Sequence, residues 1–469
     1  MPLPALIEVL PLSKEQLEAF KLQKARVVIP GSKSITNRAI VLAALGSGVT
    51  TLKGALWSED TEAMTECMRK LGIQVEVAPD VEVEANRVIT VHGCGGQLPG
   101  GGTEAEPIEL FVQNAGTAAR FLTAMVCLGG GVVRLSGVPR MHERPQMELI
   151  RALRALGYRI DTPNDRLPAV VHGGGPRPGA VVVSVDDSSQ FASALLLSSL
   201  VGGWEVSTPE GANPDELPYV EMTRQMVAVF PHTGGTFQVE PDASSASYFH
   251  AVNALFPQVE PVEVLACEPT RTDGGSGWQI DAEFPRLAPR RAVAAEAQAE
   301  DPADKRRKVA QVISRKTDLG DSIMTAVAIA PLAAVPFTFT DLGVLRKQEC
   351  ERVQALRVEL TKCKAKVTEV GDSLSVELSN PEDLGNATIF TYHDHRMAMC
   401  FATLGMAVSG IKLEDPNCTR KTVPSFFQIL AAPPPHGLGV EIWECDTKTG
   451  ERVRQLTEKE DLLAAAPSK

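Results

Sequence analysis

One pattern recurs six times along the chain: a short group of small polar or charged residues precedes an apolar segment long enough for a helix. The six groups begin, roughly 55–80 residues apart and thus further than most solenoid repeats, at Gly31, Asn114, Ser188, Asp242, Gly320 and His393. Small polar residues before an apolar run favour a helix start, and the free N–H groups of a helix start attract anions. The pattern therefore predicts six helices whose N-termini could together hold a large anion.

A second repeat alternates with the first and contributes an amphipathic helix followed by two short strands. Its clearest helix segments are TEAMTECMRKLG, MELIRALRALG and ECERVQALRVELTKC, each followed by segments that alternate apolar and polar residues around a turn. EMTRQMVAVFPHTGGTFQVEP is a shortened copy, and QIDAEFPRLAP is a candidate fifth. Each combined unit is thus expected to run strand–helix–strand–helix–strand–strand, with the apolar helix buried. Six such units predict an α/β protein of two similar lobes, with three units each, buried helices and outer sheets.

Two stretches fall outside this scheme. Residues 286–316 are highly charged around a proline, and we interpret them as a surface insertion. The tail from Pro433 is expected to be an appendage outside the repeat.

The composition narrows the class of protein. A net charge of −12 over 469 residues argues against bulk binding to nucleic acid or to an anionic membrane. The nine cysteines form no CxxC pair and are expected to be reduced. The N-terminus lacks the pattern of a signal peptide, and no uncharged apolar run reaches about 18 residues. We therefore expect a cytoplasmic protein without a membrane span, and an anionic ligand would need a local group of cations.

Basic residues do stand at the helix starts. Lys33 and Arg38 flank the first turn of a helix that is expected to be buried, where a cation is disfavoured unless it is paired. Arg120 follows the next group in the same way, with Gly116 allowing close backbone approach. Arg144 precedes a proline ahead of another helix. Snorkelling side chains are the plain alternative, but together these cations indicate an anion site.

The later motifs raise two other chemistries, metal binding and a nucleophilic cysteine. His393 and His395 have the spacing of metal ligands on a strand, but no third ligand stands out and Arg396 would repel a cation. Cys350 lacks a neighbouring histidine that could activate it, which favours a packing role over a nucleophilic one.

Taken together, the motifs resemble those of the 5-enolpyruvylshikimate-3-phosphate (EPSP) synthase family. The matching stretches, in family order from about residue 30 to 428, are PGSKSITNRA, NAGTAAR, RMHERP, SSQFASALL, PDASSASYF, QECER, YHDHRMAMCF and CTRKTVPSFF. The resemblance implies the inside-out α/β barrel of enolpyruvyl transferases, with a first lobe of 1–31 plus 242–469 and a second lobe of 32–241. It also implies an enzyme that acts as a monomer, without a metal or organic cofactor.

The implied reaction transfers the enolpyruvyl group of phosphoenolpyruvate to the 5-hydroxyl of shikimate 3-phosphate and releases phosphate. The resemblance assigns phosphoenolpyruvate binding to Lys33, Gly116, Arg144, Gln190, Arg352, Arg396 and Lys421. It assigns shikimate 3-phosphate binding to Lys33, Ser34, Arg38, Ser188, Ser189, Gln190, Tyr219 and Asp321. A carboxylate that gives and takes protons suits this addition–elimination, so Glu349 is the candidate acid/base at carbon. Asp321 is the candidate base at the hydroxyl, and Lys33 could share that proton transfer.

The chain departs from the family pattern in a few places. Glu216 stands where many members have Ser; it could repel the acceptor phosphate, face solvent or pair with Arg224. Gln348 replaces a Lys common before the proposed acid, and Phe121 replaces a Pro common after the NAGTA motif. Two alternatives therefore remain: UDP-N-acetylglucosamine enolpyruvyl transferase, whose mobile-loop cysteine is not recognisable here, and a catalytically impaired ligand-binding descendant of the synthase.

Overall fold

The computed structural model describes residues 3–209, 217–265, 278–292 and 309–464. Glu216 lies outside these described residues. Among them, no helix has the length and apolar character needed to cross a membrane.

The chain forms two compact units. The first unit joins Met1–Ile29 to Asp242–Lys469, and the second is Pro30–Pro241. The sequence analysis expects lobes of 1–31 plus 242–469 and of 32–241, and these bounds remain a prediction.

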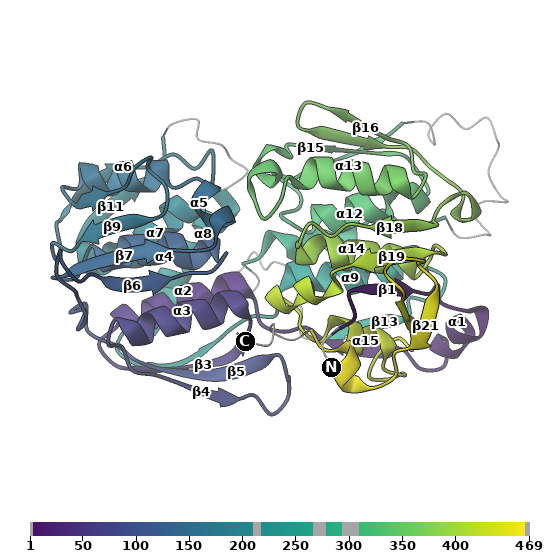
Figure 1. Ribbon diagram of the computed structural model, residues 1–469, viewed down its shortest axis with the longest axis horizontal. Coiled ribbons are helices and arrows are strands. Elements are labelled where there is room, and N and C mark those ends of the chain that lie inside the picture. Colours follow the sequence, from purple (N-terminus) through teal and green to yellow (C-terminus); the bar gives the residue numbers. More distant parts are fainter. Residues whose placement is uncertain (1–2, 210–216, 266–277, 293–308, 465–469) are drawn as a thin grey trace. The chain divides into compact units, whose positions relative to one another are not determined.

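Three buried helices contact one another at the centre of the second unit (Figure 1). They are α2 (Lys33–Leu45), α4 (Gly116–Val126) and α7 (Gln190–Gly202). Every residue of α4 is buried, as is α2 from Ile35 onward. The C-cap residue of α7 is Gly203, whose φ of 69° is the left-handed conformation that glycine adopts most readily at a helix end. These are three of the six apolar segments in the sequence pattern.

Three sheets and the amphipathic helices surround this core. One sheet has the order β12 (Gly235–Gln238), β3 (Val49–Leu56), β5 (Asn86–His92), β4 (Val75–Pro79). The next has the order β6 (Ile108–Phe111), β7 (Val132–Ser136), β9 (Ala169–His172), β8 (Arg159–Asp161). The third pairs β10 (Gly179–Val182) with β11 (Trp204–Ser207). The remaining helices are α3 (Glu59–Lys70), α5 (Pro139–Glu143), α6 (Met147–Ala155) and α8 (Leu217–Val229).

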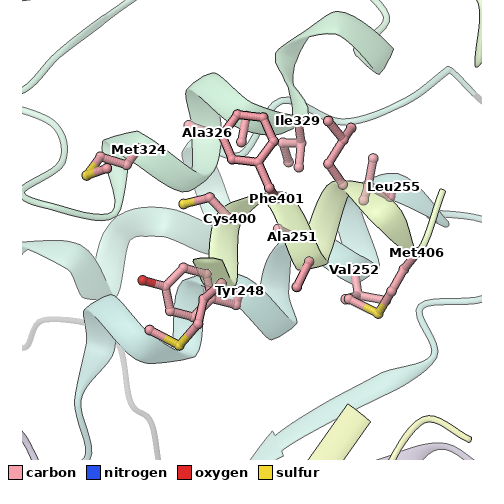
Figure 2. Packing of buried hydrophobic residues seen from close by; sticks show 14 of the residues in the cluster. Tyr248, Ala251, Val252, Leu255, Met324, Ala326, Ile329, Cys400, Phe401 and Met406 are labelled. Atoms are coloured by element: carbon pink, nitrogen blue, oxygen red, sulfur yellow. The ribbon is translucent and has the colours of Figure 1, made fainter. Parts of the chain in front are cut away.

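The first unit also has three mutually contacting helices at its centre. They are α9 (Ala243–Leu255), α12 (Ile323–Ile329) and α14 (His395–Gly405). Figure 2 shows how Tyr248 and Val252 of α9, Ile329 of α12 and Phe401 of α14 pack in this core. Burial of such side chains is the main stabilising contribution to the unit.

The sheets of the first unit draw on both ends of the chain. A five-stranded sheet has the order β18 (Ala387–Ile389), β19 (Ile411–Glu414), β1 (Leu6–Val9), β20 (Ile442–Cys445), β21 (Arg452–Gln455). A four-stranded sheet has the order β14 (Gln311–Ser314), β15 (Phe337–Thr340), β17 (Ser373–Val376), β16 (Val367–Val370). A pair joins β13 (Val262–Leu265) to β2 (Ala25–Val28).

Further helices belong to the described part of this unit. The α-helices are α1 (Lys14–Phe20), α10 (Phe284–Leu287), α13 (Arg352–Lys362) and α15 (Phe426–Ala431). The 3₁₀ helices are η2 (Ile280–Glu283), η4 (Ala330–Leu332), η5 (Gly343–Lys347), η6 (Pro381–Asp383), η7 (Pro416–Lys421) and η8 (Lys459–Leu462).

Counting α-helices and strands alone, the predicted order strand–helix–strand–helix–strand–strand occurs four times among the described residues. It runs from β2 to β5, from β6 to β9 with α5 added before α6, from β14 to β17, and from β18 to β21. The sheets also join strands from distant parts of the chain: β12 pairs with β3, β13 with β2, and β1 with β19. The order of elements therefore repeats along the chain, whereas the sheets combine segments that are far apart in the sequence.

Three expectations about the margins of the repeat need correction. The charged segment 286–316 is not all a surface insertion, because its end forms β14 and places the buried Ile313 in the core; residues 293–308 lie outside the described part. The tail after Pro433 is built into the first unit, since β20 pairs with β1. QIDAEFPRLAP is not a full repeat copy, because it forms only η2 and the short α10.

Candidate active site

The residues singled out from the sequence form one set in each unit, at or near the starts of the buried helices. The first unit contains Asp321, Glu349, Arg352, Arg396 and Lys421. The second unit contains Lys33, Ser34, Arg38, Gly116, Arg144, Ser188, Ser189, Gln190 and Tyr219.

Arg352 links the acidic residues of the first unit. It is the first residue of α13, and its side chain is 1% exposed. Its Nε lies 2.7 Å from Asp394 Oδ2, and its Nη2 lies 2.9 Å from Glu349 Oε2. Its Nη1 is also 3.6 Å from Asp321 Oδ2. One guanidinium therefore contacts both carboxylates to which the sequence assigned proton transfer.

Two further cations complete this arrangement. Lys421, at the end of η7, places its Nζ 3.2 Å from Glu349 Oε1. Arg396, in the first turn of α14, places its Nη2 3.2 Å from Asp321 Oδ2. Each of the two carboxylates is thus held by two of the cations to which the sequence assigned phosphoenolpyruvate, and all five residues of this set form one connected cluster.

The charges around Asp321 fix its protonation state. Burial raises the pKa of this carboxyl, but Arg396, Arg352 and Arg315 outweigh burial and hold the pKa well below its usual range. Asp321 is therefore a carboxylate at neutral pH, which is the form that a base requires.

The sequence analysis did not identify Asp281, which positions the start of α12. Its carboxylate is 2% exposed, accepts hydrogen bonds from Gly320 N at 2.7 Å and from Ser322 Oγ at 2.6 Å, and also accepts one from Ser244 Oγ. Burial raises the pKa of Asp281, although the hydroxyl donors act against that rise. Because Gly320 and Ser322 flank Asp321, this carboxylate anchors the backbone that carries the proposed base.

Lys33 of the second unit has an acidic partner. It is the first residue of α2, and its Nζ lies 3.0 Å from Asp60 Oδ2. Both side chains are largely buried, at 13% and 5% exposed. The pair holds the lysine at the helix start, and Ser32, the N-cap residue, makes no side-chain cap.

Arg38 is bonded to protein atoms along its whole guanidinium. Its Nε donates to Thr223 Oγ1 at 2.8 Å, its Nη2 to Ser193 Oγ at 3.0 Å and its Nη1 to Ser34 O at 2.9 Å. The guanidinium also lies 5.2 Å from the centre of the Phe121 ring, a cation–π distance. These contacts connect α2 with α7 and α8, so Arg38 has a clear structural function; its assignment to shikimate 3-phosphate remains a prediction from the family resemblance.

A compact arginine cluster forms around the start of α4. Arg120 Nη1 donates to Gln190 Oε1 at 3.0 Å, and Arg144 Nη1 donates to Asn114 O at 3.0 Å. A Cβ added to Gly116 would lie 2.3 Å from Arg120 Nη1 and 2.8 Å from Arg144 Nη2. The absence of a side chain at Gly116 is what allows both guanidinium groups to lie against this helix start.

Gly116→Ala is expected to raise the KM for phosphoenolpyruvate about tenfold or more, because the added methyl displaces both arginines and each tenfold loss corresponds to about 1.4 kcal/mol. Steady-state kinetics measures the effect. The matched control is Gly130→Ala, where a Cβ would meet nothing within 4 Å. Equal KM values for the two variants would contradict the role assigned to the arginine cluster.

The polar residues at the start of α7 adjoin this cluster through Gln190, and those on α8 adjoin Arg38. Ser189 is the N-cap of α7 without a side-chain cap, and Ser188 Oγ accepts from Gln190 N at 3.2 Å. The carbonyl of Tyr219 accepts from Thr223 Oγ1 at 2.8 Å, and this hydroxyl also binds Arg38.

The two alternative chemistries gain no support from the local geometry. Burial is the largest cause of a raised pKa at Cys350, whose Sγ lies 3.5 Å from Asp394 Oδ2. His393 Nδ1 contacts Asp415 Oδ2 at 2.6 Å, whereas His395 is buried beside Asp394. Among the residues that the structure describes, no group of three or more His, Cys, Asp or Glu side chains is arranged to hold a metal ion.

Comparisons with known proteins were made for sequence and for structure. The model of the EPSP synthase family (3-phosphoshikimate 1-carboxyvinyltransferase) matches residues 17–430. The 3-phosphoshikimate 1-carboxyvinyltransferase of Trichormus variabilis is 35% identical over 433 residues, which cover 86% of this chain and 95% of that protein. The chloroplastic 3-phosphoshikimate 1-carboxyvinyltransferase 1 of Nicotiana tabacum is 35% identical over 447 residues, covering 88% and 83%.

Solved structures give the same fold. The EPSP synthase of Acinetobacter baumannii superposes with a TM-score of 0.65 at 22% identity, covering 93% of this chain and 99% of that chain. The enolpyruvyl transferase NikO of Streptomyces tendae gives a TM-score of 0.61 at 14% identity, covering 94% and 99%. The predicted enolpyruvyl transferase fold is thereby confirmed. With the family match and the relatives at 35% identity, the chain belongs to the EPSP synthase family, as its eight motifs predicted.

Proposed function

We propose that this protein is a 3-phosphoshikimate 1-carboxyvinyltransferase, which transfers the enolpyruvyl group of phosphoenolpyruvate to the 5-hydroxyl of shikimate 3-phosphate and releases phosphate. The observation that carries the proposal is the cluster in the first unit. There, Glu349 lies between Lys421 and Arg352, and Asp321 lies between Arg352 and Arg396. Family membership supports the same activity and the use of these two small-molecule substrates.

The cations of this cluster suit the donor. Arginine presents a planar fork that matches carboxylate and phosphate groups, and lysine adds a point charge. Phosphoenolpyruvate carries both kinds of anion. Its anionic groups would therefore replace some of the ion pairs that Glu349 and Asp321 form with Arg352, Arg396 and Lys421. In the second unit, Arg144, Gly116, Gln190 and Lys33 are proposed to contact the donor as well. Fixed cations of this kind stabilise developing charge without reorganisation during the reaction.

The two carboxyl groups have separate tasks. Glu349 gives a proton to the methylene carbon of phosphoenolpyruvate, while the 5-hydroxyl oxygen attacks C2 and loses its proton to Asp321, with Lys33 able to share that transfer. The product of this addition is a tetrahedral ketal phosphate. Glu349 then removes a proton from the new methyl group as the C–O bond to phosphate breaks. The double bond returns, inorganic phosphate leaves, and no covalent bond to the protein is formed.

The acceptor assignment rests on the second unit. Ser34, Ser188, Ser189 and Tyr219 offer hydroxyl groups that suit a phosphate and a polyhydroxylated ring, and Gln190 and Arg38 complete the proposed set. On the sequence grounds given above, we also infer a cytoplasmic monomer that acts without nucleic acid or membrane. Size-exclusion chromatography with light scattering tests the oligomeric state.

The decisive experiment is a phosphate-release assay with phosphoenolpyruvate and each acceptor in turn. We expect release with shikimate 3-phosphate and none with UDP-N-acetylglucosamine. The reverse result would favour the related transferase, and no release with either acceptor, despite measurable substrate binding by calorimetry, would favour a catalytically impaired descendant.

A further inference from the structure

Arg315 is a buried cation that lies next to the proposed base. The sequence did not reveal this position. It follows β14 directly, and its backbone N–H donates to Thr340 O of the neighbouring strand at 3.1 Å. Its side chain is 2% exposed, and its Nη2 lies 3.3 Å from Asp321 Oδ1. Because a buried guanidinium is costly unless it is paired, this ion pair is a specific feature of the first unit.

The two oxygens of Asp321 have different neighbours. Oδ2 faces Arg396 at 3.2 Å and Arg352 at 3.6 Å, the two arginines proposed to bind the donor. Oδ1 faces Arg315 at 3.3 Å and accepts from the neutral amide of Gln348 at 3.4 Å. When phosphoenolpyruvate also binds Arg396 and Arg352, the pair between Oδ1 and Arg315 is the one that the donor does not share.

The residue at position 348 contacts the same oxygen of Asp321 as Arg315 does, but it is neutral. In the family pattern that the motifs resemble, a Lys is common before the acid that corresponds to Glu349, and this chain has Gln348 there. The neutral Gln348 and the cationic Arg315 come from different parts of the chain, from the end of η5 and the end of β14, yet contact the same carboxylate oxygen.

We propose that Arg315 is a positioning residue of the transferase, which holds Asp321 in place and keeps it ionised through contact with Oδ1. Arg315 thereby supplies the positive charge that position 348 lacks in this chain. The proposal rests on the function proposed above, because it concerns the base of that reaction. Arg315 contacts Asp321 and acts through it. Its removal should therefore affect proton transfer more than substrate affinity.

The first test is Arg315→Met. Loss of an opposite charge beside a carboxylate raises the pKa of that carboxylate by about 1–3 units. A base with a raised pKa is protonated, and thus inactive, up to a higher pH. We therefore expect the acid limb of the kcat profile, measured at saturating substrates, to move upward by about one pH unit or more. Asp321 stays ionised at neutral pH, so the fall in kcat expected there, about tenfold, comes from the loss of its fixed position, with KM values changed less.

The second test is rescue from another part of the chain. In Arg315→Met, the added change Gln348→Lys should return the acid limb toward its original pH, because the new ammonium can reach the same oxygen. A residue that only stabilised the fold would not be rescued in this way, so the coupling between the two positions carries the proposal. The control is Arg357→Met. It removes an arginine of α13 that is paired with Glu369, and it should leave the acid limb unchanged.

The outcomes separate this proposal from the proposed function. The wild-type protein must first release phosphate with shikimate 3-phosphate; if it does not, the proposed function fails before Arg315 is tested. If it does, an unmoved acid limb in Arg315→Met, or a moved limb that Gln348→Lys does not restore, overturns the assignment. Should Arg315→Met fail to fold, Arg315→Gln, which keeps a hydrogen-bond donor without the charge, is expected to show the same shift and rescue.

Discussion

Glu349→Gln is expected to lower kcat by about two orders of magnitude or more, because an amide cannot give a proton to carbon or take one back, and a general acid/base contributes about 10²–10⁴-fold. The side chain keeps nearly the same shape beside Lys421 and Arg352. Binding of phosphoenolpyruvate and shikimate 3-phosphate should therefore stay largely intact. Single-turnover kinetics with calorimetric binding measures the two effects separately.

The matched control is Glu351→Gln, the same change two residues further along the chain. Glu351 accepts from Gln354 N at the start of α13 and pairs with Arg346, so its carboxylate has a capping role. Turnover of this control should stay within a few-fold of the wild type. If Glu349→Gln also turned over within a few-fold of the wild type, the acid/base at carbon would have to be another group.

Arg352→Met is expected to destabilise the first unit by about 3–5 kcal/mol, the usual cost of removing one partner of a buried ion pair. Asp394, which is 0% exposed, would lose its guanidinium partner at 2.7 Å. Asp321 and Glu349 would lose a cation at the same time, and donor binding should be lost with it. Urea unfolding followed by circular dichroism and by hydrogen exchange at α13 and α14 measures the change.

The control for this prediction is Arg357→Met, on the same helix. Arg357 Nε lies 2.7 Å from Glu369 Oε2, but its side chain is 36% exposed. Exposed pairs contribute about 0–1 kcal/mol because water and salt screen them. Similar losses of stability in the two variants would mean that burial does not distinguish the pairs, which would contradict the picture of Arg352 as the link between three carboxylates.

The buried helices could be predicted, and site residues proposed at their starts, because the signals for both are local. A polar group directly before an apolar run is enough to place the starts of α2, α4 and α14, and Lys33, Gly116 and Arg396 lie within those starts. The family resemblance added the role of each residue, which neither spacing nor composition supplies.

Asp281 and Arg315 could not be predicted because their partners are set by tertiary contacts. Asp281 binds Gly320 across 39 residues of chain, and its own segment has the pattern of an amphipathic helix. Arg315 ends a run of charged residues that is typical of a solvated surface, but it directly follows β14, which pairs with β15, and its side chain is buried. Just before it, the β-branched Val312 and Ile313 are a weak local signal for a strand.

The position of β1 has a consequence for how the chain folds as it is made. This strand, at Leu6–Val9, lies between β19 and β20 in the middle of the five-stranded sheet, so its hydrogen-bonding partners are among the last residues to be synthesised. At ribosomal rates of about 5–20 residues per second, β1 must wait on the order of tens of seconds for them. The second unit is continuous in sequence and has no such delay. During translation, β1 is thus a strand without its partners, and a strand with unpaired N–H and C=O groups is a segment that a chaperone could bind.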